Sequence, residues 1–292
     1  MIPKEILQKV RRIEIRTRNV VESVLSGEYQ SVFKGRGMEF SEVRTYNPGD
    51  DIRSIDWNVT ARMGGPYVKK YVEERELTVM LVVDASASGG FGSVKQFKDE
   101  IAVELCALLA FSAIKNNDRV GLIIFTSEVE KYIPPKKGKN HVLRVIRELL
   151  YFKPEKKGTN IAEALGFLNR VQRKKAVVFC VSDFIAPPFE APMRVAARRH
   201  DLIAITIADP REQELPDVGL IDLEDPETGH TLLVDTHDKN VRERYRQDAG
   251  RRTAALQSFF RAHGIDEIPI ATEADYVEPL VKFFKKREKM YR

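Results

Sequence analysis

Apolar runs alternate with amphipathic stretches from Leu77 onward. The apolar runs predict strands at Leu77–Val83, Arg119–Phe125, Lys175–Val181 and Leu202–Ala208. Apolar residues at helical spacing predict the intervening helices at Val94–Ala113, His141–Leu150, Ile161–Val171 and Pro192–Arg199. Strands that are apolar throughout and separated by helices are typical of a parallel sheet covered on both faces. The pattern therefore predicts an α/β fold with a doubly wound, mostly parallel sheet.

Further elements are expected on either side of this core. They are an antiparallel partner strand at Glu128–Ile133, a hairpin at Leu220–Asp235, helices at Lys239–Ala262 and Tyr276–Lys286, and a basic, solvated tail at Lys282–Arg292. Before the core, a helix is expected at Lys4–Leu25. A small β-rich appendage follows, with strands at Glu39–Tyr46 and Pro66–Val72. We therefore expect residues 1–75 to form an N-terminal helix and appendage, and residues 76–292 to form the main α/β domain.

Oxygen-bearing side chains follow the strands of the expected sheet. The first strand leads into Asp84-Ala85-Ser86-Ala87-Ser88, Thr159 opens a later helix, and Asp183 follows the strand at Lys175–Val181. Each crossing of the sheet reverses direction, so all three loops belong to the same edge, where open α/β sheets bind ligands. Two carboxylates and three hydroxyls form a hard-oxygen set that suits Mg²⁺ or Mn²⁺. The sequence thus predicts a divalent-metal site.

The D-x-S-x-S loop, the later Gly158-Thr159 and Asp183 together resemble the metal-ion-dependent adhesion site (MIDAS) of von Willebrand factor type A (VWA) domains. The resemblance implies that Ser86 and Ser88 ligate the metal directly. It implies that Thr159 ligates directly or through water, and that Asp84 and Asp183 hold the metal directly or through bound water. Gly89 follows the second serine, where such sites often carry Met. That Met packs and does not ligate, so the expectation of a metal stands.

A longer motif precedes the main domain. It reads Gly35-x-Gly37-x-Glu39-Phe40-x-Glu42-x-Arg44-x-Tyr46, then Pro48-Gly49-Asp50-Asp51-x-Arg53-x-Ile55-Asp56-Trp57, Ala61-Arg62, Tyr67-Val68-Lys69 and Glu73-Glu74-Arg75. With the metal loops, it resembles the bacterial family known as domain of unknown function 58 over roughly residues 30–185. Members of that family join this segment to a VWA-like domain and are commonly encoded beside MoxR-type AAA+ ATPases. The resemblance implies a MoxR-type ATPase as partner.

Charged residues and Trp57 of the appendage have two interpretations. The alternating charges from Asp50 to Arg75 fit either a structural ion-pair network that ties the appendage to the sheet, which we favour, or a docking surface. Trp57 is expected to be a buried anchor between appendage and main domain. Beside Thr159, Lys153, Lys156 and Lys157 form either a solvated loop or a basic rim that attracts a partner's acidic residue toward the metal.

Composition narrows the class of protein. The chain of 292 residues has a formal charge of +5 and a pI of about 9.0, a mild basicity that favours anionic partners or acidic protein surfaces. It has no zinc-finger spacing or aromatic-basic motif, so no nucleic-acid partner is expected. Cys106 and Cys180 lie in apolar runs and are expected to be buried thiols of a reducing compartment. With no signal peptide and no apolar run near the ~18 residues that span a bilayer, a cytoplasmic location and no transmembrane segment are expected.

The expected function is a non-enzymatic, metal-dependent protein-interaction module. It would act as an adaptor with a MoxR-type ATPase in assembly or maturation of protein complexes, and an acidic ligand would donate a carboxylate to the metal. No catalytic residue is expected. One alternative is a Mg²⁺-dependent phosphohydrolase with Asp84 as nucleophile, although Ser86 stands where such enzymes need a carboxylic acid. A metal-free structural scaffold is the other alternative.

Overall fold

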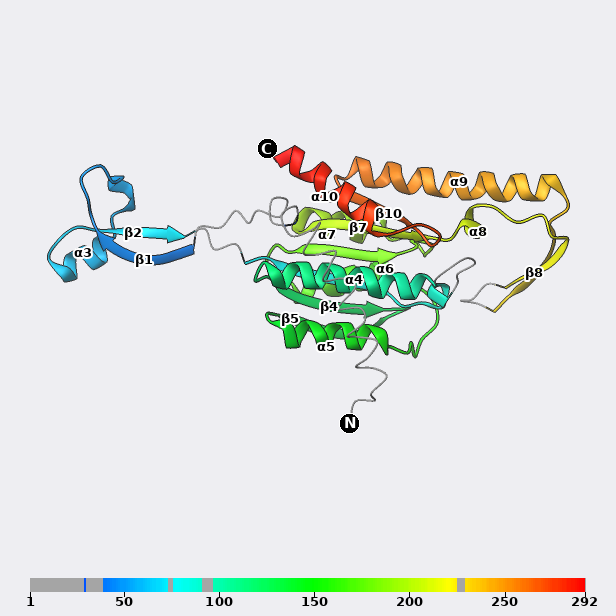
Figure 1. Cartoon of the computed structure of the whole chain (residues 1–292), viewed down its shortest axis with the longest axis horizontal. Helices are drawn as coiled ribbons and strands as arrows, with labels where there is room; N and C mark the ends of the chain where they lie inside the picture. Colours follow the sequence, from blue (N-terminus) through cyan, green and yellow to red (C-terminus); the bar gives the residue numbers. More distant parts are fainter. Residues whose placement is uncertain (1–28, 30–38, 73–75, 91–96, 225–228, 292) are drawn as a thin grey trace. The chain divides into compact units, whose positions relative to one another are not determined.

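Figure 1 shows the computed structural model, which describes residues 29, 39–72, 76–90, 97–224 and 229–291. The chain divides into two compact units. One comprises Phe33–Leu77, and the other comprises Met1–Val32 together with Thr78–Arg292. The expected helix at Lys4–Leu25 falls on residues that the structure does not describe. Tyr29, which the sequence assigned to the appendage, groups with the larger unit.

A six-stranded sheet forms the centre of the larger unit. Its order is β10 (Asp266–Ala271), β7 (Asp201–Ala208), β6 (Val177–Ser182), β3 (Thr78–Asp84), β4 (Arg119–Phe125) and β5 (Val129–Lys136). Every neighbouring pair is parallel except β4 with β5, which is antiparallel. The chain builds outward from β3 to β4 and β5, then returns to β6 on the other side of β3. The expected doubly wound, mostly parallel α/β sheet is confirmed, and its strand order reverses beside β3.

Helices cover both faces of the sheet. On one face, Met80 and Val82 of β3 pack with α6 (Ile161–Val171), α7 (Glu190–Arg199) and Phe260 of α9 (Lys239–Ala262). Successive side chains of a strand point to opposite faces. Val79, Leu81 and Val83 therefore face the other layer, which contains α4 (Lys98–Lys115) and α5 (Lys139–Leu150). In Figure 1, α9 and α10 (Val277–Tyr291) run along one side of this unit and α5 along the other.

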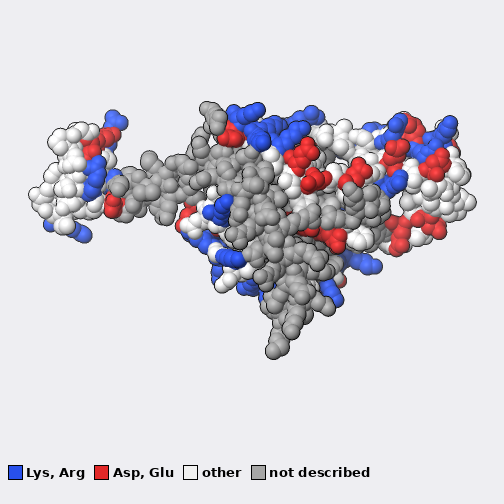
Figure 2. All heavy atoms as spheres, viewed as in Figure 1, with Lys and Arg blue, Asp and Glu red and all other residues white. Residues whose placement is uncertain are grey.

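The β10 strand and the buried residues of the basic tail differ from expectation. No strand was predicted at β10, where Pro269 interrupts the alternation of Ile268 and Ile270. Proline is tolerated there because β10 is an edge strand. In α10, Lys and Arg side chains gather on the surface (Figure 2), but Arg287 is buried and donates to Asp201 at 3.0 Å. The expectation of a solvated tail was therefore wrong at Arg287, and also at Phe283 and Phe284, which are buried.

A separate hairpin, β8 (Leu220–Glu224) with β9 (Thr231–Asp235), forms a two-stranded antiparallel sheet, as expected. Its register pairs Ile221 with Val234 and Leu223 with Leu232, so these four apolar side chains share one face. Leu232 is 66% exposed. A short helix, α8 (Pro210–Gln213), lies between β7 and this hairpin in the chain. Among the described residues, no helix has both the length and the apolar content needed to cross a bilayer.

The smaller unit contains a hairpin and one helix. Strands β1 (Glu39–Thr45) and β2 (Tyr67–Val72) pair antiparallel, as expected, and the turn between them carries η2 (Ile52–Ser54) and the unexpected α3 (Trp57–Met63). The α3 helix begins at Asp56, whose carboxylate accepts from two backbone amides, and it ends at the left-handed Gly64 (φ 72°). Sequence periodicity missed α3 because the helix has only seven residues and no buried face.

Charges in the smaller unit pair with one another. Arg44 binds both carboxylate oxygens of Asp50, at 2.7 and 2.8 Å, and Lys69 lies 3.7 Å from Asp56. The Arg44 hydrogen bond holds the pKa of Asp50 below its usual value. These ion pairs lie within the smaller unit itself. Trp57 is 66% exposed, so its side chain is not buried within its own unit.

Candidate functional site

The candidate site lies where β3 and β6 end. These strands are parallel neighbours, with Val83 opposite Val181, so Asp84 and Ser182-Asp183 leave the sheet side by side. The chain winds away from β3 in opposite directions, which makes this edge the switch point of the sheet. Ligands of open α/β sheets bind in the crevice at such points. The strand order alone therefore brings two of the expected metal ligands together.

Asp84 is held by hydrogen bonds to both of its oxygens. Oδ1 accepts from the backbone N–H of Ser86 at 2.9 Å, and Oδ2 accepts from the Ser182 hydroxyl at 2.7 Å. Burial, together with the nearby Asp183, raises the pKa of Asp84 to about 6, against the lowering effect of the Ser182 hydrogen bond. The carboxylate is thus short of positive charge, a deficit that a bound cation would remove.

The two serines of the loop also converge. Their hydroxyl oxygens lie 3.0 Å apart, and Ser86 is buried. The loop forms the short η3 helix (Ala87–Gly90), which turns Ser88 back toward Ser86. Asp84, Ser86, Ser88 and Asp183 line one small cavity of about 20 Å³. A space of that size accepts a single water-sized species.

Thr159 lies at the same edge of the sheet but does not line this cavity. It is buried, at 4% exposure, directly before α6. The next residue, Asn160, donates its backbone N–H to the carbonyl of Thr126 at 2.8 Å, and Thr126 follows β4. Thr159 is therefore placed near the end of β4, beside β3. The structure brings four of the five expected ligands around one cavity and puts the fifth in the adjoining loop.

Lys98 enters this cavity, which the sequence did not indicate. As the first residue of α4, it is 3% exposed, and its ammonium donates to Asp183 Oδ2 at 3.0 Å and to Glu212 of α8. Burial lowers the pKa of Lys98, but Asp183 and Glu212 outweigh burial and raise it overall. The other oxygen of Asp183 accepts from the backbone N–H of Ile185 at 3.0 Å. A lysine ordinarily belongs on the surface, so only the tertiary structure reveals this contact.

The oxygen donors of this cavity fit a hard divalent cation, provided that Asp183 is released from Lys98. Within the described residues, no group of three or more His, Cys, Asp or Glu side chains could hold a metal. The set here has a different composition, with two carboxylates and serine hydroxyls, and such oxygen donors suit Mg²⁺. Asp84 with Ser86 and Ser88 offers one side of a coordination shell. Asp183 can join it once Oδ2 is released from Lys98. Asp99, which was not among the expected ligands, also lines this cavity.

The expected basic rim lies on exposed residues. Lys153, Lys156 and Lys157 are all exposed in the loop before Thr159. Lys156 lies 3.8 Å from Glu128, and its backbone N–H donates to Glu130 at 3.2 Å. Glu130 also accepts from the backbone of Glu155, so this carboxylate organises the loop. Lys156 therefore faces acidic residues of the chain itself.

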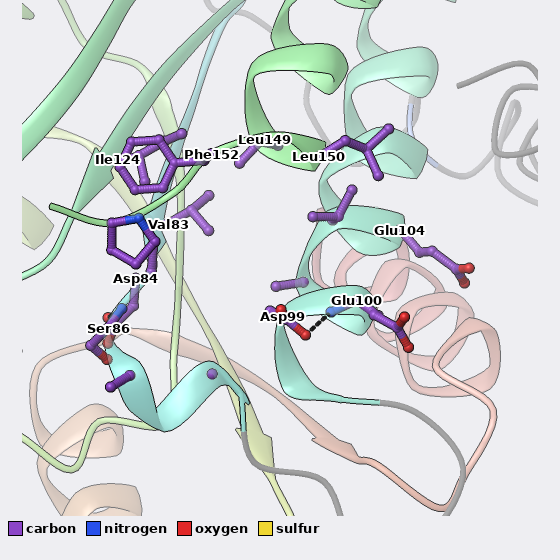
Figure 3. A pocket seen from close by; sticks show the side chains of 16 residues that line it. Val83, Asp84, Ser86, Asp99, Glu100, Glu104, Ile124, Leu149, Leu150 and Phe152 are labelled. Atoms are coloured by element: carbon purple, nitrogen blue, oxygen red, sulfur yellow. Dashed lines mark hydrogen bonds between the residues drawn. The ribbon is translucent and has the colours of Figure 1, made fainter. Parts of the chain in front are cut away.

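Three larger cavities adjoin the candidate site, one of which, of about 610 Å³, is lined by Asp183 and Glu212. Figure 3 shows another, of about 590 Å³, in which Asp84 and Ser86 meet an apolar wall that includes Val83, Ile124 and Phe152. Asp99, Glu100 and Glu104 of α4 line its other side. The third cavity, of about 800 Å³, runs from Ser88 and Ile185 past Glu212 to the apolar face of the β8–β9 hairpin. The candidate site therefore borders partly apolar cavities.

Comparisons with known proteins give a family match. The family model described as "Protein of unknown function DUF58" matches residues 42–255. An uncharacterized protein of Mycobacterium bovis is 31% identical over 283 residues, which covers 96% of this chain and 89% of that protein. An uncharacterized protein of Mycobacterium tuberculosis (strain H37Rv) matches with the same identity and coverage.

Solved structures also share similarity at low identity. A conserved hypothetical protein, BatB from Bacteroides thetaiotaomicron, has a TM-score of 0.47 and 16% identity, covering 73% of this chain and 99% of that one. The VWA domain of SpRpn10 has a TM-score of 0.41 and 12% identity, covering 71% and 95%. Likeness at this level says nothing about what the chain binds.

Proposed function

The chain belongs to the DUF58 family, and on that premise we propose that it is a metal-dependent protein-interaction module. The observation that carries the proposal is the convergence of Asp84, Ser86, Ser88 and Asp183 on one cavity at the switch point of the sheet. Asp84 supports it further, because its buried carboxylate lacks a cationic partner in the described contacts.

Each side chain has a distinct role in the proposed site. Ser182 holds Asp84 through its 2.7 Å hydrogen bond, so the carboxylate is oriented before any cation arrives. Ser86 and Ser88 present neutral hydroxyl oxygens, and Asp183 supplies the second negative charge. A bound Mg²⁺ or Mn²⁺ would supply an open coordination position for a carboxylate of an acidic protein ligand. Lys153 and Lys157 would speed the approach of such a ligand and add little to its final affinity.

We propose a MoxR-type AAA+ ATPase as the partner, with the chain as an adaptor in assembly or maturation of protein complexes. The ATPase follows from the resemblance to proteins commonly encoded beside such ATPases. The chain is proposed to be non-enzymatic: Ser86 stands two residues after Asp84, and its hydroxyl cannot serve as the carboxylic acid that an aspartyl phosphatase needs.

The test measures binding of the host's purified MoxR-type ATPase to the immobilised chain. Because the ATPase itself uses Mg²⁺, the comparison is made between variants in the same Mg²⁺ buffer. We expect Asp183→Ala and Ser86→Ala to weaken binding at least about tenfold, equivalent to 1.4 kcal/mol. Asp222→Ala, which changes an exposed carboxylate of β8, is the matched control and should bind like wild type. Equal affinity for all four proteins would contradict metal-mediated docking.

A second candidate, the metal-free scaffold, is favoured by one observation. Lys98 already supplies a positive charge to Asp183. In a scaffold, Lys98, Asp183 and Glu212 would form a permanent ion-pair cluster that links α4, β6 and α8. Such a chain would bind no Mg²⁺ or Mn²⁺ at millimolar concentration, and the Ser86→Ala change would alter local stability alone.

A further inference from the structure

The Lys98 ammonium is a cation that lies within the candidate site. It binds Asp183 Oδ2 at 3.0 Å, and the side chains of Lys98 and Asp183 are 4% and 3% exposed. Glu212 accepts the second hydrogen bond of the same ammonium. Lysine is almost never buried without a partner, since moving an ammonium out of water is costly. The pair of carboxylates therefore keeps Lys98 charged and inside the protein.

Two cations can bind the carboxylate of Asp183. Asp183 is one of the two acidic ligands of the proposed metal site, and its other oxygen already accepts from the backbone of Ile185. A divalent ion bound through Oδ2 would have to replace the ammonium there. Two cations on one carboxylate oxygen repel each other at short distance, so occupancy by one disfavours the other.

Glu212 offers Lys98 an alternative partner. It is anchored in α8, where its other oxygen accepts from the backbone N–H of Asp209 at 3.0 Å. Asp209 is itself buried, and it accepts from Thr272 at 2.7 Å. The Glu212 carboxylate is thus held in place, and the ammonium can remain paired with it when Asp183 is taken by another cation.

We propose that Lys98 is a built-in cation that competes with the divalent metal for Asp183, and that metal entry transfers its ammonium wholly to Glu212. The inference rests on the proposed metal site and names its regulation. Glu212 also lines the 800 Å³ cavity beside the apolar face of the β8–β9 hairpin. Metal occupancy therefore changes the charge distribution on a wall of that cavity. A protein ligand that spans the metal and this cavity would distinguish the metal-bound form from the metal-free form.

The experiment titrates Mn²⁺, as a paramagnetic substitute for Mg²⁺, into the full chain and counts free Mn²⁺ by electron paramagnetic resonance. Lys98→Met keeps the length of the side chain and removes its charge. We expect it to bind Mn²⁺ about 10- to 100-fold more tightly than wild type, a coupling of ordinary size for competing ligands. Lys115→Met, an exposed lysine at the other end of α4, is the matched control and should leave the affinity unchanged.

Glu212→Gln tests the proposed transfer of the Lys98 ammonium to Glu212. Without the Glu212 charge, Lys98 has Asp183 as its main partner, so Mn²⁺ should bind at least about threefold more weakly than to wild type. This variant also keeps the test open if Lys98→Met does not fold without metal, because Glu212→Gln retains the side-chain shape. Circular dichroism in EDTA reports the folding of each variant.

The outcomes separate the two proposals. Mn²⁺ affinity that is unchanged or weaker in Lys98→Met, with wild type binding normally, overturns the competition and leaves the metal site standing. Binding by Lys98→Met alone supports the competition and overturns metal dependence of the native chain. Absence of Mn²⁺ binding in every variant overturns both.

Discussion

Buried polar side chains differ in how their burial is compensated. Lys98 has two carboxylates, and Arg287 has Asp201 with Asp266 2.8 Å away. His200 differs from both of these residues. It is 3% exposed, and neither ring nitrogen has a hydrogen-bond partner in the part of the chain that the structure describes. Burial, together with Arg199 and Lys175, lowers the pKa of His200 to about 4.

His200 makes stability sensitive to acid. The unfolded chain takes up a proton on this residue as the pH falls below 6.5, whereas the folded chain resists until about pH 4. The free energy of unfolding should therefore fall through that window, by about 2 kcal/mol from this residue at pH 5. In urea denaturation at pH 7.5 and pH 5, His200→Leu should lose about 2 kcal/mol less than wild type does.

The control is His263→Leu, which changes an exposed histidine at the end of α9. It should keep the wild-type difference between the two pH values. If His200→Leu loses as much stability in acid as wild type, the histidine is already protonated or accessible in the folded protein.

At the scale of elements, a side-chain cap fixes where α6 begins beside the site. The α6 helix matches its expected bounds because Asn160 ends the preceding loop with a side-chain cap, accepting from the backbone N–H of Glu163 at 3.0 Å. Ile161, Ala164, Leu165 and Leu168 then fall on one buried face. The same cap fixes the position of Thr159, one residue earlier.

Removal of this cap should be measurable. Asn160→Ala leaves the amide of Glu163 without its acceptor and should lower the free energy of unfolding by about 1 kcal/mol. Asn160→Asp keeps an acceptor at the cap and should stay within about 0.5 kcal/mol of wild type. Urea denaturation in EDTA measures both, so that no metal contributes. Equal stability of the alanine and aspartate variants would mean that the cap is unimportant.

At the scale of the whole molecule, Tyr29 makes buried contacts with two distant segments of the larger unit. Its side chain is 1% exposed, its hydroxyl donates to Asp118 at 3.1 Å, and its ring lies 5.9 Å from that of Phe284 in α10. Asp118 precedes β4 and Phe284 belongs to the last helix. One residue thus joins three distant parts of the sequence.

Truncation at this position should destabilise the larger unit. Tyr29→Ala removes a buried ring and should cost about 3 kcal/mol of unfolding free energy. Tyr29→Phe keeps the ring, loses the hydrogen bond, and should cost about 1 kcal/mol. Thermal and urea denaturation measure the series, with Tyr151→Ala, at 39% exposure, as the surface control. A Tyr29→Ala protein as stable as the control would show that this contact is dispensable.

Periodicity and turn chemistry in the sequence determined the core elements and the order of the ligand loops. The β4 strand and the α6 helix match their expected bounds because each has a regular apolar pattern, and α9 matches because Asp238 caps its start. The alternation of strands and helices also placed Asp84 and Asp183 at one edge, since parallel strands end together. Short or interrupted elements, such as α3 and β10, lacked that pattern.

Tertiary structure alone decided which residues far apart in the sequence come into contact. The burial of Lys98 between Asp183 and Glu212 depends on residues 85 and 114 positions away. The pairing of Arg287 and the exposure of Trp57 likewise follow from packing that no local pattern specifies. A charged or aromatic residue looks the same in a sequence whether its partner is solvent or a distant side chain. The sequence therefore determined the donors of the candidate site, and only the fold determined which cation already lies beside them.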